Sequence, residues 1–210
     1  MKKFLLPLLT ILLFTACQNQ ISIDKVTICG KDWMVKNLDV STYRNGDPIP
    51  EVTDPTAWFA LTTGAWCWYN NDSATNASTY GKLYNWYAVN DPRGLAPTGW
   101  HVPSDAEWTT LSTCLGGDAV AGGAMKETGT THWTSPNTGA TNSSGFTGLP
   151  GGGRNNDGTF GLVGNAGYWW SSSENDTPGA WARYLYYDDG IIVRSNNGKQ
   201  DGFSVRCVRD

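Results

Sequence analysis

Charge and histidine are both scarce in this chain of 210 residues. Charged residues make up 16% of it, the formal net charge is −4, and the two histidines are His101 and His132. An acidic chain lacks the basic surface that nucleic acid requires, so nucleic-acid partners are excluded. Neither histidine has a cysteine or carboxylate at the spacing of a zinc site, and we expect no metal and no cofactor.

Long hydrophobic runs are also lacking, with one exception at the start. Residues 4–16 form an apolar run of thirteen residues behind Lys2 and Lys3, which is shorter than the roughly 18 residues of a membrane-spanning helix and typical of a signal peptide. The run ends in LFTAC, which resembles a bacterial lipobox. We expect a lipoprotein signal peptide over 1–16, lipidated Cys17 and a short tether over 17–25, and a domain over 26–210. The alternative is an ordinary secretory signal.

Tryptophan and glycine, by contrast, are abundant, at 11 and 25 residues. Large rigid rings among many tight turns favour an ordered, loop-rich fold. Residues 26–40 alternate as a hairpin does, with a turn at 30–32, and 41–78 are expected to be ordered loops with short strands. Apolar Leu83, Trp86 and Tyr87 predict a helix from about Tyr80 to just before Asp91.

A capping box gives the clearest local pattern. Ser104 and Glu107 have the spacing at which each side chain bonds the other's backbone amide, and two glycines follow at 116 and 117. They predict a helix over 105–115. Later apolar runs between Gly, Asn and Asp clusters predict strands at 160–163, 168–172, 180–187, 191–194 and 203–208.

Six ordered blocks resemble the Fibrobacter succinogenes major paralogous domain family. They are WMVKNLDV at 33–40, YGKLYNWYAV at 80–89, GWHVPSDAEWTTL at 99–111, LPGGGR at 149–154, YWWSSSE at 168–174 and GFSVRCVRD at 202–210. The resemblance implies an α+β, C-type-lectin-like fold, similar to that of formylglycine-generating enzymes. Such a fold packs two helices on a twisted, mainly antiparallel sheet with many ordered loops, and its first and last strands meet.

Four cysteines remain in the expected domain: Cys29, Cys67, Cys114 and Cys207. In an exported chain they favour disulfides, and the sequence leaves three connectivities open. Lectin-like folds tether a cysteine of the closing strand to the first helix, and this resemblance implies Cys67 as the partner of Cys207, with Cys29 and Cys114 paired or free. The redox cysteine pair of formylglycine-generating enzymes has no counterpart, since residues 181–206 contain no cysteine.

Catalytic motifs such as GxSxG, HExxH or a phosphate-binding loop are absent from the sequence. Polar and aromatic residues instead concentrate in the late loops, where they suit sugar rings, hydroxyls or carboxylates. The lectin-like resemblance implies that these segments converge on one face, although the aromatic residues also suit core packing. The candidate ligand-binding residues are Arg154, Asn155, Asp157, Glu174, Asn175, Asp176, Trp181, Arg183, Tyr186 and Asp188.

Three hypotheses for function follow. The first is a non-catalytic ligand-binding or adhesion module with a glycan or protein ligand, held by its lipid in the outer membrane and facing either the periplasm or the cell surface. The second is a structural component of the envelope or of an appendage. The third is an enzyme on the fold of the formylglycine-generating enzymes.

Overall fold

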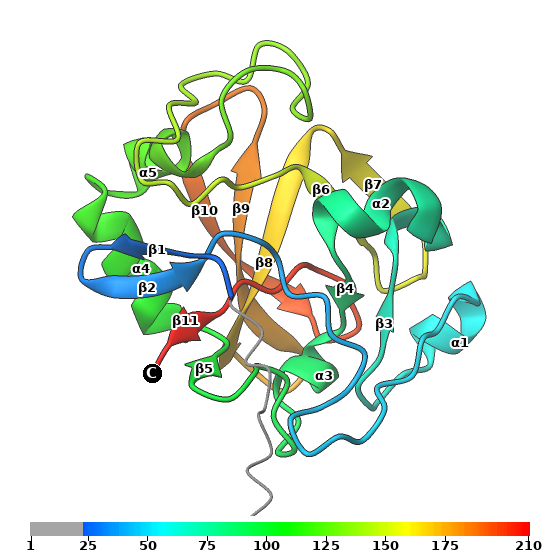
Figure 1. The fold of residues 1–210 in the computed structure, drawn as a ribbon. Coiled ribbons are helices and arrows are strands. Elements are labelled where there is room, and N and C mark those ends of the chain that lie inside the picture. Colours follow the sequence, from blue (N-terminus) through cyan, green and yellow to red (C-terminus); the bar gives the residue numbers. More distant parts are fainter. Residues whose placement is uncertain (1–22) are drawn as a thin grey trace, which may run out of the picture.

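A computed structural model describes residues 23–210 of the chain, which form a mixed α+β fold with a large share of ordered loops (Figure 1). The expected signal peptide, Cys17 and most of the tether lie outside the described residues. The strands are β1 (Lys25–Ile28), β2 (Lys31–Met34), β3 (Trp66–Cys67), β4 (Leu83–Tyr84), β5 (Trp100–His101), β6 (Gly151–Arg154), β7 (Phe160–Val163), β8 (Ala166–Glu174), β9 (Gly179–Tyr186), β10 (Ile192–Gly198) and β11 (Val208–Arg209).

The helices over the same range are short. They are α1 (Pro55–Phe59), the 3-10 turn η1 (Tyr69–Asn71), α2 (Ser73–Tyr80), α3 (Trp86–Val89), α4 (Asp105–Cys114) and α5 (Asp118–Met125). Within residues 23–210, none of them has the length and apolar character that crossing a membrane would require.

The strands form three sheets. A four-stranded sheet has the order β1-β2-β11-β5, a five-stranded sheet has the order β10-β9-β8-β6-β7, and β3 pairs with β4. The only parallel pair between these strands, within residues 23–210, joins β6 to β8. The predicted opening hairpin is confirmed as β1 and β2, and the closing strand β11 pairs with β2, so the two ends of the described chain meet in one sheet.

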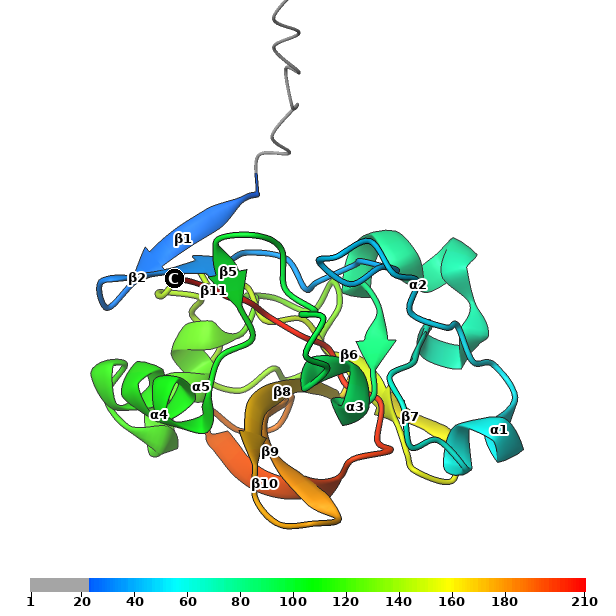
Figure 2. The same ribbon diagram turned by 90° about the horizontal axis from the view of Figure 1, so that it is seen from below.

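Both faces of the central strands β8 and β9 are buried. Tyr168, Trp170 and Tyr184 lie on one face, in a hydrophobic cluster with Phe203. The alternate residues Trp169 and Leu185 face the other way, into a second cluster. Because side chains alternate along a strand, this sheet separates two cores. Figure 2 shows that the sheet lies on the side of the molecule opposite β1.

Helix α4 begins as the capping box predicts. Ser104 accepts from the backbone N–H of Glu107, and the Glu107 carboxylate accepts from the backbone N–H of Ser104 at 2.9 Å. Trp108 and Leu111 are buried on its inner face. The predicted helix over 105–115 is confirmed.

The helix predicted from about Tyr80 to just before Asp91 is wrong. Helix α2 ends at Tyr80, where Gly81 takes a positive φ of 70°. Leu83 then lies in β4 opposite Cys67, and Asn85 caps the four-residue helix α3. A strand followed by one helical turn produced the i, i+3, i+4 spacing. Leu83 is buried in β4, and Trp86 is buried in the single turn of α3.

Helix α5 was not predicted, because two glycines lie inside it. Added Cβ atoms at Gly122 and Gly123 would overlap with the carbonyl oxygens of Ile191 and Gly139. The Gly123 N–H donates to the Gly190 carbonyl at 2.9 Å. The glycines therefore allow close approach of the helix to two loops, and α5 rather than a helix at 80–90 packs beside α4 on the five-stranded sheet.

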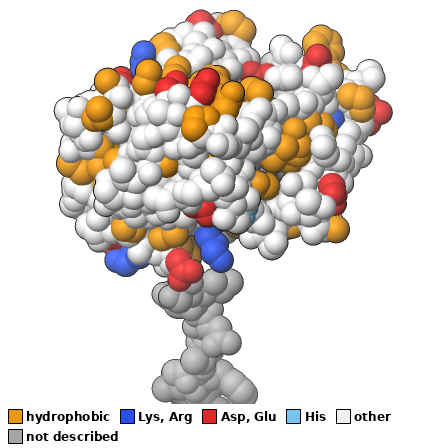
Figure 3. Space-filling view, turned by 90° about the horizontal axis from the view of Figure 1, so that it is seen from above, with side chains coloured by type: hydrophobic (Ala, Val, Ile, Leu, Met, Phe, Trp, Pro, Cys, Tyr) orange, Lys and Arg blue, Asp and Glu red, His pale blue; other side chains and the backbone are white. Residues whose placement is uncertain are grey.

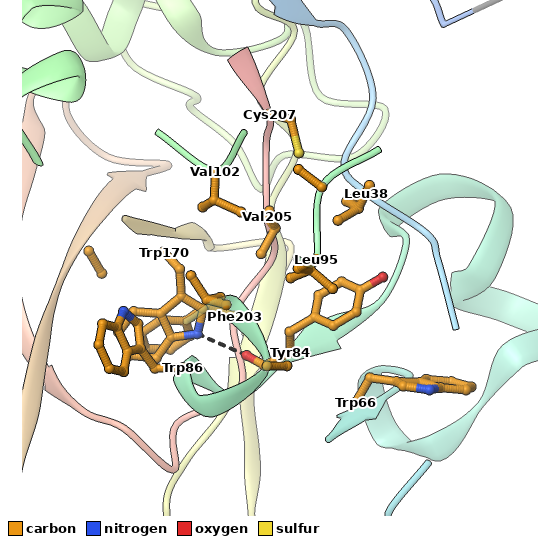
Figure 4. Packing of buried hydrophobic residues seen from close by; sticks show 14 of the residues in the cluster. Leu38, Trp66, Tyr84, Trp86, Leu95, Val102, Trp170, Phe203, Val205 and Cys207 are labelled. Atoms are coloured by element: carbon orange, nitrogen blue, oxygen red, sulfur yellow. Dashed lines mark hydrogen bonds between the residues drawn. The ribbon is translucent and has the colours of Figure 1, made fainter. Parts of the chain in front are cut away.

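Buried indoles hold many of the loops. Trp170 donates to the carbonyl of Tyr84 at 2.8 Å (Figure 4). Five further tryptophans make the same kind of bond to a backbone carbonyl: Trp58, Trp66, Trp86, Trp108 and Trp133. Backbone carbonyls outside regular sheets need donors when they are buried, and tryptophan supplies a donor together with a large apolar surface.

One disulfide is present in the described chain, between Cys29 and Cys114, whose Cα atoms lie 6.3 Å apart. The expected Cys67–Cys207 pair is wrong, because both cysteines are free and buried in different clusters. Cys207 lies beside Val205 in the core drawn in Figure 4, whereas Cys67 packs with Trp58 and Leu83. Burial raises the pKa of both thiols to about 12.

Peptide mapping without reductant is expected to link Cys29 to Cys114, with Cys67 and Cys207 reacting with an alkylating reagent only after unfolding. The double variant Cys29→Ser, Cys114→Ser should lose about 3 to 5 kcal/mol of unfolding free energy, because the bond closes a long loop. Cys207→Ala is the control that keeps the disulfide. A Cys67–Cys207 peptide would contradict the arrangement.

Candidate functional site

The structure separates the ten candidate residues. The β6–β7 hairpin carries Arg154, Asn155 and Asp157, and the β8–β9 hairpin carries Glu174, Asn175 and Asp176. Asp188 follows β9. Along β9, Trp181 and Arg183 alternate with Tyr184 and Tyr186 and so lie on the opposite face of the sheet. The expected convergence on a single face is therefore wrong.

Arg154 does not lie on an exposed loop, as was expected, but is buried, with 1% of its surface exposed. Its guanidinium donates to the carbonyls of Val52, Thr53 and Gly158 at 2.6 to 3.1 Å and lies 4.3 Å from the Trp58 ring centre. These bonds join the β6–β7 hairpin to the segment before α1. Three backbone carbonyl oxygens accept hydrogen bonds from the guanidinium. These bonds replace the water that the group loses when it is buried.

Arg183 is likewise buried, at 2% exposed. It donates to Asp105 Oδ1 at 2.8 Å, and Arg194 bonds the same carboxylate from β10. The Arg194 guanidinium also lies 3.3 Å from the centre of the Trp181 ring. Arg183 and Trp181 thus fasten β9 and β10 to the first turn of α4.

The polar side chains of the β8–β9 hairpin bond mainly to one another and to nearby side chains of β10 and the turn after it. Glu174 pairs with Lys199 at 2.6 Å, and Asp176 accepts from Asn175 and Asn196. Asp157 similarly accepts from Thr159 within the β6–β7 turn. These exposed side chains stabilise turns, and no cavity found in the described chain is lined by them.

Two of the candidates, Asn155 and Tyr186, do share a cavity. It has a volume of about 200 Å³ and opens between β6, β7, β8, β9 and the segment after β10. We call it the tyrosine pocket. Its lining residues are Gly153, Asn155, Gly161, Leu162, Tyr168, Tyr184, Tyr186, Asn197, Asp201 and Phe203.

Three tyrosine rings shape the pocket. The rings of Tyr168 and Tyr184 meet at 84°, with centres 4.5 Å apart. Tyr186 stands at 89° to each of them, at 6.4 and 6.3 Å. The three rings are therefore mutually perpendicular, and the Tyr184 hydroxyl donates to the Asn197 amide oxygen.

Asp201 provides the carboxyl of the pocket. Burial raises its pKa to about 6, and the charge of Asp157 adds to the rise, while hydrogen bonds from Asn197 and from the backbone of Asn156 and Gly198 lower it. Asp201 has no salt bridge within residues 23–210. Asp201 is half-buried, and a titratable group with a perturbed pKa in a cavity is a candidate functional group.

Sequence reasoning missed five polar or aromatic residues of the pocket: Tyr168, Tyr184, Asn197, Asp201 and Phe203. Period-two alternation placed Tyr184 and Tyr186 on one face of a strand and could have grouped them. Nothing local to Asp201 distinguishes it from other Asp-Gly turns, because its burial depends on the packing of β6 and β10.

A second cavity, of about 290 Å³, contains none of the candidates. It lies between β2, α2 and the segment after α5 and is lined by Val35, Lys36, Asn37, Ser78, Thr79, Glu127, His132, Thr147, Leu149 and Arg206. Arg206 is buried and donates to Met34, Phe146 and Asn37, and His132 pairs with Glu127 at 2.8 Å. Arg206, His132 and Glu127 thus bond to carbonyl oxygens or to an opposite charge, whereas Asp201 of the tyrosine pocket has no ion pair in the described chain, which makes the tyrosine pocket the stronger candidate.

The outer surface offers no comparable feature on the face drawn in Figure 3, where hydrophobic side chains lie in separate patches among polar ones. The large exposed hydrophobic residues of the described chain are spread over several elements: Phe59, Val120, Leu162, Val163 and Ile191.

The model of the Fibrobacter succinogenes major domain matches residues 26–209. The chain therefore belongs to this family, as the six sequence blocks had indicated. Neither a curated protein nor a solved structure gives a significant match to the chain. The family match names no ligand, so the argument for function rests on the pocket.

Asp201→Asn should raise stability at neutral pH. A carboxyl whose folded pKa lies above its unfolded value of 3.8 binds more protons when folded, so stability falls as pH rises from about 4 to about 6. The variant cannot ionise and should exceed wild type by about 1 to 3 kcal/mol at neutral pH, and by much less near pH 4. Denaturant unfolding across this range measures the difference. A constant difference would contradict the raised pKa.

Proposed function

We propose that this protein is a ligand-binding module of the bacterial cell envelope, held by a lipid on Cys17 in the outer membrane, with a glycan as its ligand. The tyrosine pocket carries the proposal. It combines ring faces, which stack on sugar rings, with the amides of Asn155 and Asn197 and the carboxyl of Asp201, which bond hydroxyls. Its volume of about 200 Å³ suits one sugar unit rather than a drug-sized ligand.

The stability cost of Asp201 supports the same proposal. A buried carboxyl with a raised pKa weakens the folded state at neutral pH. Such a group is easily replaced by a neutral one, and proteins commonly keep destabilising groups where binding needs them. Arg154 and Arg183, in contrast, are bonded within the fold and contribute to its stability.

The proposed fold class is C-type-lectin-like. Supporting features are the pairing of β2 with the closing strand β11, the capped helix α4 on a mainly antiparallel sheet, and long ordered loops. The tyrosine pocket is lined in part by β8 and β9. Figure 2 shows these two strands on the side of the molecule opposite β1.

The same arrangement suits an anchored module. The tether expected over 17–25 enters the fold at β1, and the five-stranded sheet lies on the opposite side of the molecule (Figure 2). A lipid on Cys17 would then leave the tyrosine pocket facing away from the membrane surface.

A glycan array probed with the full chain in a non-sugar detergent tests ligand binding. Tyr186→Ala and Asn155→Ala are expected to weaken binding at least about tenfold, since each removes a group from the pocket. Trp181→Ala and Asn175→Ala are matched controls that lie outside the pocket and should bind as wild type does. Equal loss in the controls would contradict the pocket, and no glycan ligand at all would favour a structural envelope role.

Metabolic labelling with a fatty acid tests the anchor. The wild-type chain should carry label and fractionate with the outer membrane, whereas Cys17→Ala should carry none. Cys67→Ala, which leaves the lipobox intact, is the control. Equal labelling of wild type and Cys17→Ala would overturn the lipid anchor while leaving the pocket untouched.

A further inference from the structure

The tyrosine pocket has the geometry of an aromatic cage. The rings of Tyr168, Tyr184 and Tyr186 stand at 84° to 89° to one another, and Phe203 stacks on Tyr168 with ring centres 5.0 Å apart. All three tyrosines line the same pocket, while Phe203 covers one face of Tyr168. A cation in this pocket would lie against aromatic rings, whose faces attract positive charge.

The cage contains no cation of the protein's own. Elsewhere in residues 23–210, Lys and Arg side chains lie over Trp58, Trp66, Trp68, Trp86 and other rings, but none lies over the three tyrosines. Lys199, on the turn after β10, is paired with Glu174 instead. No side-chain cation of the described residues therefore occupies the pocket.

Asp201 adds a negative charge at the same place. The charged group that acts on it most clearly is another carboxylate, Asp157, and its other partners are neutral: the Asn197 amide and two backbone N–H groups. A buried carboxylate is costly when nothing of opposite charge is near. The pocket thus has a single negative charge, walled by rings, and lacks its counter-ion.

We propose that the tyrosine pocket binds an ammonium group of its ligand, with the tyrosine faces around the cation and the Asp201 carboxylate as its counter-ion. This inference rests on the proposed function, because it names the ligand chemistry of that pocket. The ammonium can be the primary one of an unacetylated amino sugar or the quaternary one of a choline-type headgroup. A neutral sugar would leave the charge of Asp201 uncompensated.

The inference requires a pH dependence of definite sign. The cation binds the ionised form of Asp201, and it competes with the proton for that carboxylate. Affinity should therefore rise as pH increases through about 6, the pKa of Asp201 in the free pocket. Tyr168 and Tyr184 stay protonated throughout, because burial raises their pKa values further above the ordinary value.

The experiment compares charged ligands with neutral counterparts on the full chain in a non-sugar detergent. Choline is paired with its carbon isostere, in which a tert-butyl group replaces trimethylammonium, and glucosamine is paired with N-acetylglucosamine. Titration calorimetry or NMR at about pH 7.5 and about pH 4.5 should show at least about tenfold preference for one charged member at the higher pH. The preference should shrink at the lower pH, and the pair that shows it identifies the source of the ammonium.

Two variants test whether Asp201 and Tyr186 cause the preference for the charged ligand. Asp201→Asn should reduce the preference for charge at about pH 7.5 to that of wild type at about pH 4.5, and Tyr186→Leu should weaken binding of the charged ligand by about tenfold. Tyr186 is chosen because it is only partly buried, whereas replacing Tyr168 or Tyr184 would disturb the core. Trp181→Ala, on the opposite face of the sheet, is the matched control and should keep both affinity and preference.

Equal binding of the neutral isostere, or a preference that is unchanged in Asp201→Asn, would overturn the inference. So would the absence of binding by every ammonium compound. If neutral glycans bind in a Tyr186-dependent manner while ammonium compounds do not, this inference fails and the proposed function stands. If nothing binds to the pocket, both fail together.

Discussion

The structure depends on donors that reach the backbone carbonyls of its loops. In the described chain, regular strands and helices are short, so many carbonyls find no partner in a ladder or helix. Side chains from distant segments supply the donors: the indoles of Trp58, Trp66 and Trp133, and the cations Lys126, Arg154 and Arg206. The indoles of Trp86, Trp108 and Trp170 bond carbonyls in strands β8 and β4. Lys126, fully buried, bonds the carbonyls of Thr138, Tyr186 and Asp189. An unmet buried carbonyl costs about 1 to 3 kcal/mol, so these bonds hold the loops in place.

That constraint explains why the sequence predicted some features and not others. The capping box of α4 and the β1–β2 hairpin are local patterns, and both were predicted correctly. Helix α5 and the role of Arg154 depend on segments far away in sequence: the Ile191 loop in one case, Val52 and Thr53 in the other. In the sequence, Arg154 stands among Asn and Asp residues in a late loop and therefore resembles a ligand-binding residue. In the structure, its N–H groups already donate to backbone carbonyls.

The pocket was predictable only in part for the same reason. Tyr186 and Asn155 belong to the segments that composition favoured, and they do line the cavity. Asp201 belongs to an ordinary turn in the sequence and becomes half-buried only when the β6–β7 turn and β10 come together around it. Trp181 and Tyr186 are equally half-buried candidates on β9, and β-strand alternation assigns them to opposite faces, of which Tyr186 alone lines the pocket.

The buried charges of the described chain differ in how they are compensated. Arg154, Arg206 and Lys126 lie among carbonyl oxygens, whose negative ends replace the lost water. Arg183 has Asp105. Asp201 accepts hydrogen bonds from neutral donors only, and the nearby charge of Asp157 adds to the rise of its pKa. The buried cations named above all have partners within the fold. Packing therefore gives no reason why Asp201 should lack a counter-charge. The three perpendicular tyrosines beside it supply the reason, because together they form a site that an external cation completes.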